Sequence, residues 1–381
     1  MQFAIPLGIF SHVNGLVGRL DDFHPDVYLS TFSALDAYFG VSSGNRLMVS
    51  TAGTLIDLAK AFPEIEYPGI EGMDARVPTA EGEIYFSCHD DVTRPPKHPF
   101  TALNLLYDFR NRKFVDPYEG YWDVRARALR PGVAPQNEPS WQIIADAAVA
   151  LSRYSFRLEP EIELVPPPSG VTMEPASQKL LLELLLTGRN PKPGFELLRS
   201  TGFISRHWPE LERMDGINHS KAHHPEGNVW EHTLETFGYR KTPDLALSLG
   251  LLFHDSGKPF AVRNEGRMFD GHAEIGAQIV VAFLNRLGFP REIVDDVRFL
   301  VRQHMLPPFI AKLATYRTEH ILASPLFPLL LELYRCDISA TYRGPDGYYE
   351  ACKVYRRFLR NARNPFRSAD GKKLLRLYVE P

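Results

Sequence analysis

Hydrophobic residues recur at two different spacings along the chain, and the change falls at a proline-rich stretch. Before residues 165–170 (VPPPSG), short apolar runs at 46–50 and 82–88 predict β-strands, and helical spacing predicts helices at 54–61 and 141–153. Three consecutive prolines cannot continue a helix or a central strand, so this stretch marks a boundary. After it, helical spacing dominates, over residues 177–186, 195–200, 229–237, 244–253, 272–287, 291–304, 325–336 and 348–360. The pattern predicts an α+β protein, with a small mixed α/β head followed by a mainly α-helical bundle.

Composition narrows the class of protein. A chain of 381 residues, 44% hydrophobic and 23% charged, is long enough for two or three globular domains. The net charge of −3 and the three cysteines, without a CxxC pair, predict a reducing compartment and no strongly cationic surface. The N-terminus lacks the basic and apolar segments of a signal peptide, and no apolar run approaches the ~18 residues of a membrane helix. We therefore expect a cytoplasmic protein with no membrane partner.

Histidine and aspartate residues are placed on several of the predicted helices of the second half. His232 lies on an amphipathic helix, His254 and Asp255 end an apolar one, and His272 and His304 stand near a helix start and a helix end. Asp337 follows the apolar run FPLLLELYRC. A helix bundle can gather such groups in its interior, and imidazole with carboxylate suits iron, manganese, nickel or zinc, while magnesium is also compatible. The sequence predicts a site for one or two divalent metals.

The order H…HD…H…H…D over residues 210–345 resembles the HD superfamily of metal-dependent phosphohydrolases. The resemblance implies the metal ligands His232, His254, Asp255, His272, His304 and Asp337. It also implies catalytic roles for Asp255, which would bridge or support the metals, and for Lys258, beside a substrate phosphate. A metal-bound hydroxide would then attack phosphorus. Four further side chains are candidates for binding the substrate, although each is also typical of a polar surface: His224, Arg263, Arg302 and Arg317.

Residues 98–132 (HPFTALNLLYDFRNRKFVDPYEGYWDVRARALRPG) resemble part of the head of bacterial CCA-adding enzymes and poly(A) polymerases, and residues 137–160 resemble their neck. That family uses a D-x-D pair for magnesium, a GGxxRD turn for triphosphate and an ED-x-x-R segment that reads the nucleotide. We placed Ser50-Thr51 at the glycine pair, Asp74-Ala75-Arg76 at the carboxylates and Gln142 at the arginine. One carboxylate is too few for two magnesium ions, so this alignment predicts a degenerate head that no longer transfers nucleotides.

These patterns together predict four parts: a nucleotidyltransferase-like head at 1–132, a neck and linker at 133–209, an HD domain at 210–345 and a basic C-terminal helix at 346–381. The principal functional prediction is a metal-dependent phosphohydrolase, acting as a phosphomonoesterase or 2′,3′-cyclic phosphodiesterase. Its substrate would be a phosphorylated small molecule, a nucleotide or an RNA 3′ end. Two alternatives stay open: a tRNA CCA-adding nucleotidyltransferase with an accessory HD domain, and an RNA-binding adaptor. The basic aromatic stretch at 355–378 fits either RNA binding or a solvated helix.

Overall fold

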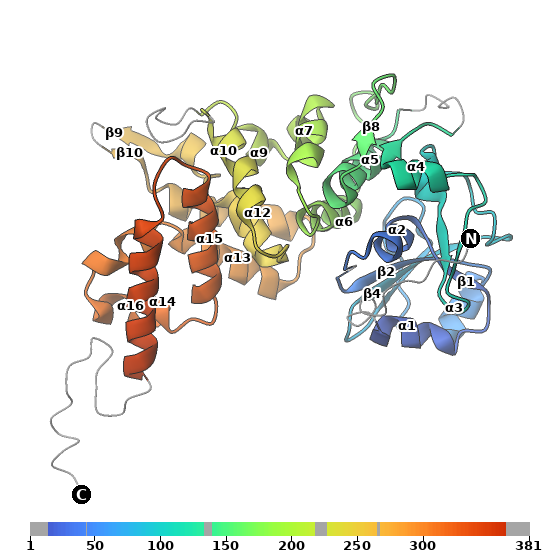
Figure 1. Ribbon diagram of the computed structural model, residues 1–381, viewed down its shortest axis with the longest axis horizontal. Coiled ribbons are helices and arrows are strands. Elements are labelled where there is room, and N and C mark those ends of the chain that lie inside the picture. The colour runs from blue at the N-terminus through green and yellow to red at the C-terminus, as the bar shows by residue number, and fades with distance from the viewer. Residues whose placement is uncertain (1–13, 43, 133–138, 218–226, 265–266, 363–381) are drawn as a thin grey trace, which may run out of the picture. The chain divides into compact units, whose positions relative to one another are not determined.

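A computed structural model describes residues 14–42, 44–132, 139–217, 227–264 and 267–362. The chain divides into two compact units, Met1–Arg189 and Asn190–Pro381, and each is described by itself (Figure 1). The division falls inside the segment at 133–209 that the sequence assigns to a neck and linker. In the described residues, no helix is both long enough and apolar enough to cross a membrane.

A six-stranded sheet forms the centre of the first unit, in the order β3-β4-β2-β1-β5-β6. Strands β2 and β4 run parallel, and the other neighbouring pairs are antiparallel. The strands are β1 (Val27–Leu29), β2 (Arg46–Thr51), β3 (Ala75–Pro78), β4 (Glu83–Cys88), β5 (Leu106–Asp108) and β6 (Lys113–Val115), with a separate pair of β7 (Ala128–Leu129) and β8 (Arg157–Leu158). Because the central residues of β2 and β4 are all buried, each strand contains a short continuous apolar run, at 47–49 and 84–86, and does not alternate.

Helices cover this sheet and extend the unit toward residue 189. They are α1 (Asn14–Asp21), α2 (Thr31–Phe39), α3 (Leu55–Ala61), the 3₁₀ helix η2 (Thr101–Asn104), α4 (Tyr121–Ala126), α5 (Trp141–Tyr154) and α6 (Pro175–Leu186). Helix α2 packs on β2 and β5 and ends at Gly40, whose φ of 69° suits the left-handed cap that glycine adopts without strain. Helix α3 begins with a capping box between Thr54 and Asp57. Helices α5 and α6 pack on each other.

The second unit is a helical bundle with one two-stranded ribbon, β9 (Val262–Asn264) and β10 (Arg267–Asp270). Its α-helices are α7 (Lys192–Ser200), α8 (Phe203–His207), α9 (Pro209–Glu212), α10 (Val229–Thr236), α11 (Leu245–Phe253), α12 (His272–Arg286), α13 (Arg291–Gln303), α14 (Thr315–Leu322), α15 (Phe327–Ser339) and α16 (Asp346–Ala362). Short 3₁₀ helices follow α10 and α11 and precede α14: η3 (Phe237–Tyr239), η4 (Lys258–Phe260) and η5 (Pro307–Lys312). Helix α11 lies against α13 and α15, and every residue of the helix after Leu245 is buried.

The architecture confirms the predicted fold class, a small α/β head followed by a mainly helical part. Each helix and strand predicted from hydrophobic spacing is present, with ends that differ by a few residues. The sequence did not predict β1 and α2, which form a strand–turn–helix unit at 27–39. It also missed several of the short elements, because three-residue strands carry too little pattern to recognise.

Candidate functional site

The end of helix α11 brings His254 and Asp255 into the interior of the second unit. Asp244 caps the start of the helix by accepting a hydrogen bond from the Leu247 amide, at 2.8 Å. His254 and Asp255 follow its last turn and are 1% and 3% exposed. The chain then turns at Gly257, where an added Cβ would lie 2.0 Å from the backbone oxygen of His272. Glycine is therefore required for α12 to approach this turn closely enough to deliver His272.

Three of the buried histidines are oriented in the same way. The Nδ1 atoms of His254, His272 and His304 each lie within hydrogen-bond distance of the backbone oxygen three residues earlier, at 2.7, 2.8 and 2.6 Å. A carbonyl oxygen only accepts, so each Nδ1 carries a proton, and in the neutral form of each ring Nε2 presents a lone pair. This arrangement is typical of histidines that bind a metal through Nε2.

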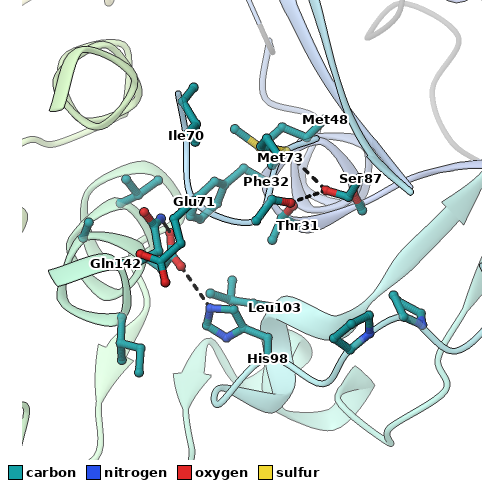
Figure 2. Close-up of a pocket in the computed structure, with 18 of the residues that line it drawn as sticks. Thr31, Phe32, Met48, Ile70, Glu71, Met73, Ser87, His98, Leu103 and Gln142 are labelled. Atoms are coloured by element: carbon teal, nitrogen blue, oxygen red, sulfur yellow. Dashed lines mark hydrogen bonds and ion pairs between the residues drawn. The ribbon is translucent and has the colours of Figure 1, made fainter. Parts of the chain in front are cut away.

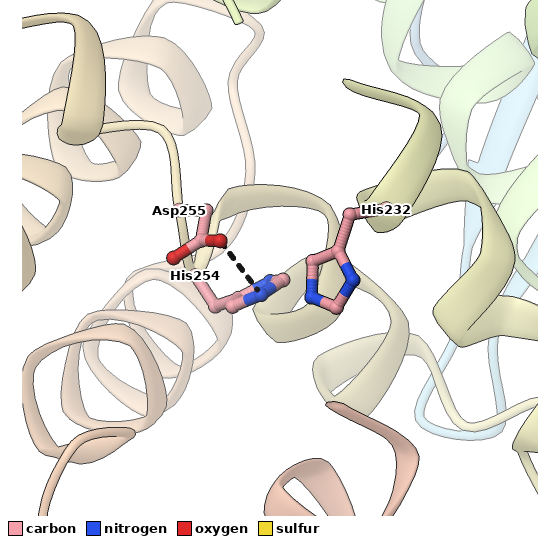
Figure 3. A group of neighbouring side chains, drawn as sticks. All are labelled: His232, His254 and Asp255. Carbon is pink, nitrogen blue, oxygen red and sulfur yellow. Dashed lines mark ion pairs between the residues drawn. The ribbon is translucent and has the colours of Figure 1, made fainter. Parts of the chain in front are cut away.

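The lone-pair atoms converge on two carboxylates. His272 Nε2 lies 3.6 Å from Asp255 Oδ1 and 3.1 Å from His304 Nε2, while His254 Nε2 lies 3.4 Å from Asp255 Oδ2. On the other side of the cluster, His232 Nε2 and His254 Nε2 lie 3.0 and 3.9 Å from Asp337 Oδ1. Figure 3 shows His232 facing the His254–Asp255 pair from a neighbouring helix. Two groups could each hold a cation, His232–His254–Asp255 and Asp255–His272–His304, with ligand atoms within 4.8 Å of one another.

Electrostatics keeps these groups in the protonation states that a metal needs. Burial lowers the pKa of His304 to about 3 and also lowers that of His272, so both imidazoles are neutral near pH 7. Burial would raise the pKa of Asp255, but the neighbouring His254 and Lys258 hold it well below its usual range. For Asp337, burial is likewise outweighed, chiefly by the hydrogen bond with His232, and its pKa is lowered. The neutral imidazoles of His272 and His304 and the ionised carboxylates form a suitable donor set for a divalent transition metal.

The structure thus gathers all six residues predicted as metal ligands, and Lys258 Nζ lies 2.5 Å from Asp255 Oδ2. The catalytic roles assigned to Asp255 and Lys258 stay predictions. Among the residues predicted to bind substrate, Arg302 and Arg317 are exposed, and Arg317 donates to the Tyr316 hydroxyl. His224 and the side chain of Arg263 lie outside the described residues.

A second site lies in the first unit, where a pocket of about 700 Å³ opens beside the central sheet (Figure 2). Its lining comes from the turn before α2, from β2, from the segment before β3, from the loop at 95–99, and from α5 and α6. Much of the wall is apolar, including Phe32, Met48, Ile70, Met73, Leu103 and Leu181. Two lining residues carry carboxylates, Glu71 and Asp146. A pocket of this size, apolar with a few polar groups, is typical of small-molecule binding.

The turn that lines this pocket differs from the one placed by the sequence alignment. Ser50 and Thr51 belong to strand β2, where they pair with Tyr28 and Val27. The strand–turn–helix unit instead joins β1 to α2 through Ser30 and Thr31, and Thr31 has the positive φ of 45°. The alignment was wrong here because Ser-Thr-Ala-Gly resembles a turn in sequence, whereas sheet pairing places Ser50 and Thr51 at the end of a strand.

Other head residues also have local partners. Asp74 accepts a hydrogen bond from the Cys88 amide at 2.8 Å, next to strand β3.

Gln142 does line the pocket, from the first turn of α5. Sequence reasoning missed Glu71 and Asp146, since a lone carboxylate in a loop or on a helix has no distinguishing pattern.

The fold of this chain is that of the CCA-adding enzymes. The CCA-adding enzyme of Bacillus stearothermophilus, solved in complex with CTP, matches it with a TM-score of 0.50 and 17% sequence identity, over 93% of this chain and 83% of that one. The chain is also homologous to the multifunctional CCA protein of Alkalilimnicola ehrlichii, at 31% identity over 283 residues. That alignment covers 68% of this chain and 66% of the relative, just under two thirds of its length. No family model matches the chain.

This homology contradicts the principal functional prediction, a phosphohydrolase whose head has lost nucleotide transfer. It favours the alternative predicted from the sequence, a nucleotidyltransferase of the CCA-adding type. The H…HD…H…H…D pattern did find a cluster of histidine and aspartate side chains that could hold a metal, but it does not show an HD-superfamily domain. A cluster of metal-binding side chains indicates what a site can bind, but it does not determine which reaction the protein catalyses. The functional prediction failed because it inferred a reaction from such a cluster.

Proposed function

We propose that this chain is a nucleotidyltransferase that adds CMP and AMP to the 3′ end of a tRNA. The observation that carries the proposal is its homology over 283 residues to a multifunctional CCA protein. A CCA-adding enzyme of the same fold binds CTP, and the pocket beside the sheet of the first unit has the size and composition for a nucleotide. The reaction forms a bond between the RNA 3′ oxygen and the α-phosphorus and releases pyrophosphate.

The pocket offers groups for each part of a nucleoside triphosphate. Its apolar wall suits the base, while Lys97 lies at its edge, where the ammonium group donates to the Gly132 carbonyl at 2.9 Å. Magnesium is commonly held by one or two carboxylates together with substrate phosphates, so the exposed Glu71 would hold it with the triphosphate. Magnesium bound there would neutralise charge on the phosphate oxygens during transfer. Asp146 is less suited to this role, because both its oxygens accept hydrogen bonds from side chains.

Nucleotide incorporation tests this proposal. The full chain is incubated with a tRNA lacking its last three nucleotides, labelled CTP or ATP, and Mg²⁺ or Mn²⁺. We expect stepwise extension, and we expect Glu71→Gln to slow it by about 10²-fold, as for loss of a group that stabilises transition-state charge. The matched control is Glu81→Gln, which removes an exposed carboxylate from the β3–β4 turn and should extend normally. Absence of extension by the unaltered chain with either metal would refute the proposal.

We further propose that the second unit holds one or two divalent transition metals. The ligands would be His232, His254, Asp255, His272, His304 and Asp337. The shared orientation of three histidines supports this, as does the position of Asp255 between two ligand groups. The donor set of imidazole and carboxylate suits iron, manganese, nickel or zinc.

Metal analysis of the purified chain tests this second site separately from nucleotide transfer. We expect about one or two metal ions per chain, and close to none in Asp255→Ala, because that variant removes a ligand common to both groups. Asp295→Ala is the matched control, since this carboxylate lies on α13 and is 58% exposed. Equal metal content in the Asp255 variant and the control would remove Asp255 from the site.

A further inference from the structure

Helix α16 carries a concentration of positive charge on its last three turns. The helix packs on η5, α14 and α15 in the second unit (Figure 1). Residues 351–362 contain no acidic side chain, although the net charge of the whole chain is −3. They contain four cations, all of them exposed, which together are called the cationic face: Lys353, Arg356, Arg357 and Arg360.

Helical geometry places these cations away from the side that α16 buries. The buried residues of the helix are Ala351, Phe358 and Asn361. At about 100° per residue, Lys353, Arg356 and Arg360 point within about 60° of one another, and roughly opposite to Phe358. The three side chains therefore follow one line along the solvent side of the helix, about one cation per turn, with Arg357 beside them.

The arginines of the cationic face have no structural role in the described part of the chain. Lys353 pairs with Glu350 at 2.6 Å. The guanidinium groups of Arg356, Arg357 and Arg360 form no ion pair, hydrogen bond or ring contact with any residue that the structure describes. A helix C-terminus attracts cations, but this effect is confined to the last turn, and both Arg356 and Arg357 precede it. Neither packing nor the helix dipole thus accounts for this row of charge.

A row of unpaired guanidinium groups suits a polyanion with repeated phosphates. Guanidinium is more weakly hydrated than ammonium, and its planar fork can donate to two phosphate oxygens at once. No carboxylate of residues 351–362 competes for these donors. Contacts of this kind hold a nucleic acid in position and carry no sequence information. The chemistry of the face therefore fits an RNA backbone.

We propose that the cationic face of α16 binds the phosphate backbone of RNA, independently of base sequence, and so holds an RNA substrate on the second unit. The proposal rests on the proposed function only for the choice of RNA as the polyanion. The face shares no residue with the pocket of the first unit or with the candidate metal ligands, so it can be altered separately from both.

The test measures binding of the full chain, without nucleotide, to a fluorescent tRNA transcript that lacks its last three nucleotides. Anisotropy is recorded from about 50 to 500 mM KCl, because phosphate contacts release counterions and depend on salt. Arg356→Gln/Arg360→Gln should weaken binding by about tenfold per arginine near 0.1 M salt. The slope of log affinity against log salt should become shallower by roughly two. Arg356→Lys/Arg360→Lys keeps both charges and should retain most of that slope.

The matched control is Arg291→Gln/Arg298→Gln, which makes the same change of charge on α13. Both arginines are exposed, and Arg291 lies 3.5 Å from Asp295, so this helix carries charges of both signs. Its affinity for the transcript should stay within about twofold of that of the unaltered chain, because isolated surface charges are screened by salt. The α16 variant should unfold at the same temperature as the unaltered chain, since its arginines have no partner to lose.

Three outcomes would overturn the inference. The first is an α16 variant that binds the transcript as tightly as the unaltered chain. The second is an equal loss of affinity in the α13 control, which would show dependence on net charge alone. The third is loss of binding to phosphatidylserine vesicles with RNA binding unchanged, which would make the face a membrane-binding surface. RNA binding that requires the α16 arginines, without incorporation of nucleotides, would instead refute the proposed transfer reaction and leave the inference standing.

Discussion

The ion pair between Asp36 and Arg153 joins helix α2 to helix α5. Substituting these two residues tests the structure of the first unit. The Arg153 side chain is 0% exposed and forms a bidentate contact, Nε to Oδ1 at 2.7 Å and Nη2 to Oδ2 at 3.0 Å. The Tyr154 hydroxyl adds a hydrogen bond to Asp36 at 2.8 Å. Burial alone would lower the pKa of Arg153, but the Asp36 carboxylate outweighs it and keeps the guanidinium charged.

Asp36→Ala removes one partner and leaves a buried cation without its counter-charge. Breaking a buried pair in this way costs about 3–5 kcal/mol in the free energy of unfolding. Replacing both partners, in Asp36→Leu/Arg153→Met, removes the charge together with its partner, so we expect a cost of about 1–2 kcal/mol at most. Some cost remains because Arg153 also donates to the Ser42 carbonyl and the Thr187 hydroxyl.

Hydrogen exchange measured by mass spectrometry resolves the two units within one chain. Peptides from α2 and α5 should lose protection in Asp36→Ala and regain most of it in the double variant, while peptides from α11 to α13 serve as the internal reference. Glu66→Ala, which breaks the exposed pair with Arg76, should cost under about 1 kcal/mol. A cost below about 1 kcal/mol for Asp36→Ala, or a double variant less stable than the single one, would refute the reasoning.

Three further predictions concern buried groups. The second unit of the metal-free chain should lose stability as the pH falls from about 6.5 toward 3. Burial holds the pKa of His304 at about 3 in the folded state, so in that pH range His304 binds a proton only in the unfolded state. Denaturant unfolding at several pH values should show this slope, and His304→Gln should reduce it. Gly257→Ala should destabilise the same unit by roughly 3 kcal/mol, because the new Cβ would overlap the His272 carbonyl. In the control, Gly238→Ala, the new Cβ enters open space, so this variant should unfold at nearly the same temperature as the unaltered chain. Cys336, whose pKa burial raises to about 12, should resist iodoacetamide near pH 8 in the native chain and react on unfolding, as followed by mass spectrometry.

The sequence by itself determined the fold class and most of the second unit's candidate metal site. Long helices such as α12 and α13 carry several turns of hydrophobic spacing, so their positions follow from local pattern. His254 and Asp255 are adjacent in the chain, and the other candidate ligands lie on helices or at their ends, so the sequence alone could predict a shared site.

Only the tertiary structure decided the pocket of the first unit and the residues that line it. Gln142 and Asp146 are one helical turn apart, but their partner His98 is 48 residues from Asp146, and the pairing of Asp36 with Arg153 spans 117 residues. Short strands such as β1 form because neighbouring strands supply their hydrogen bonds, so no local signal distinguishes a turn at Ser30 from one at Ser50. Contacts between distant segments depend on packing and sheet register, and these are properties of the folded chain that hydrophobic spacing does not encode.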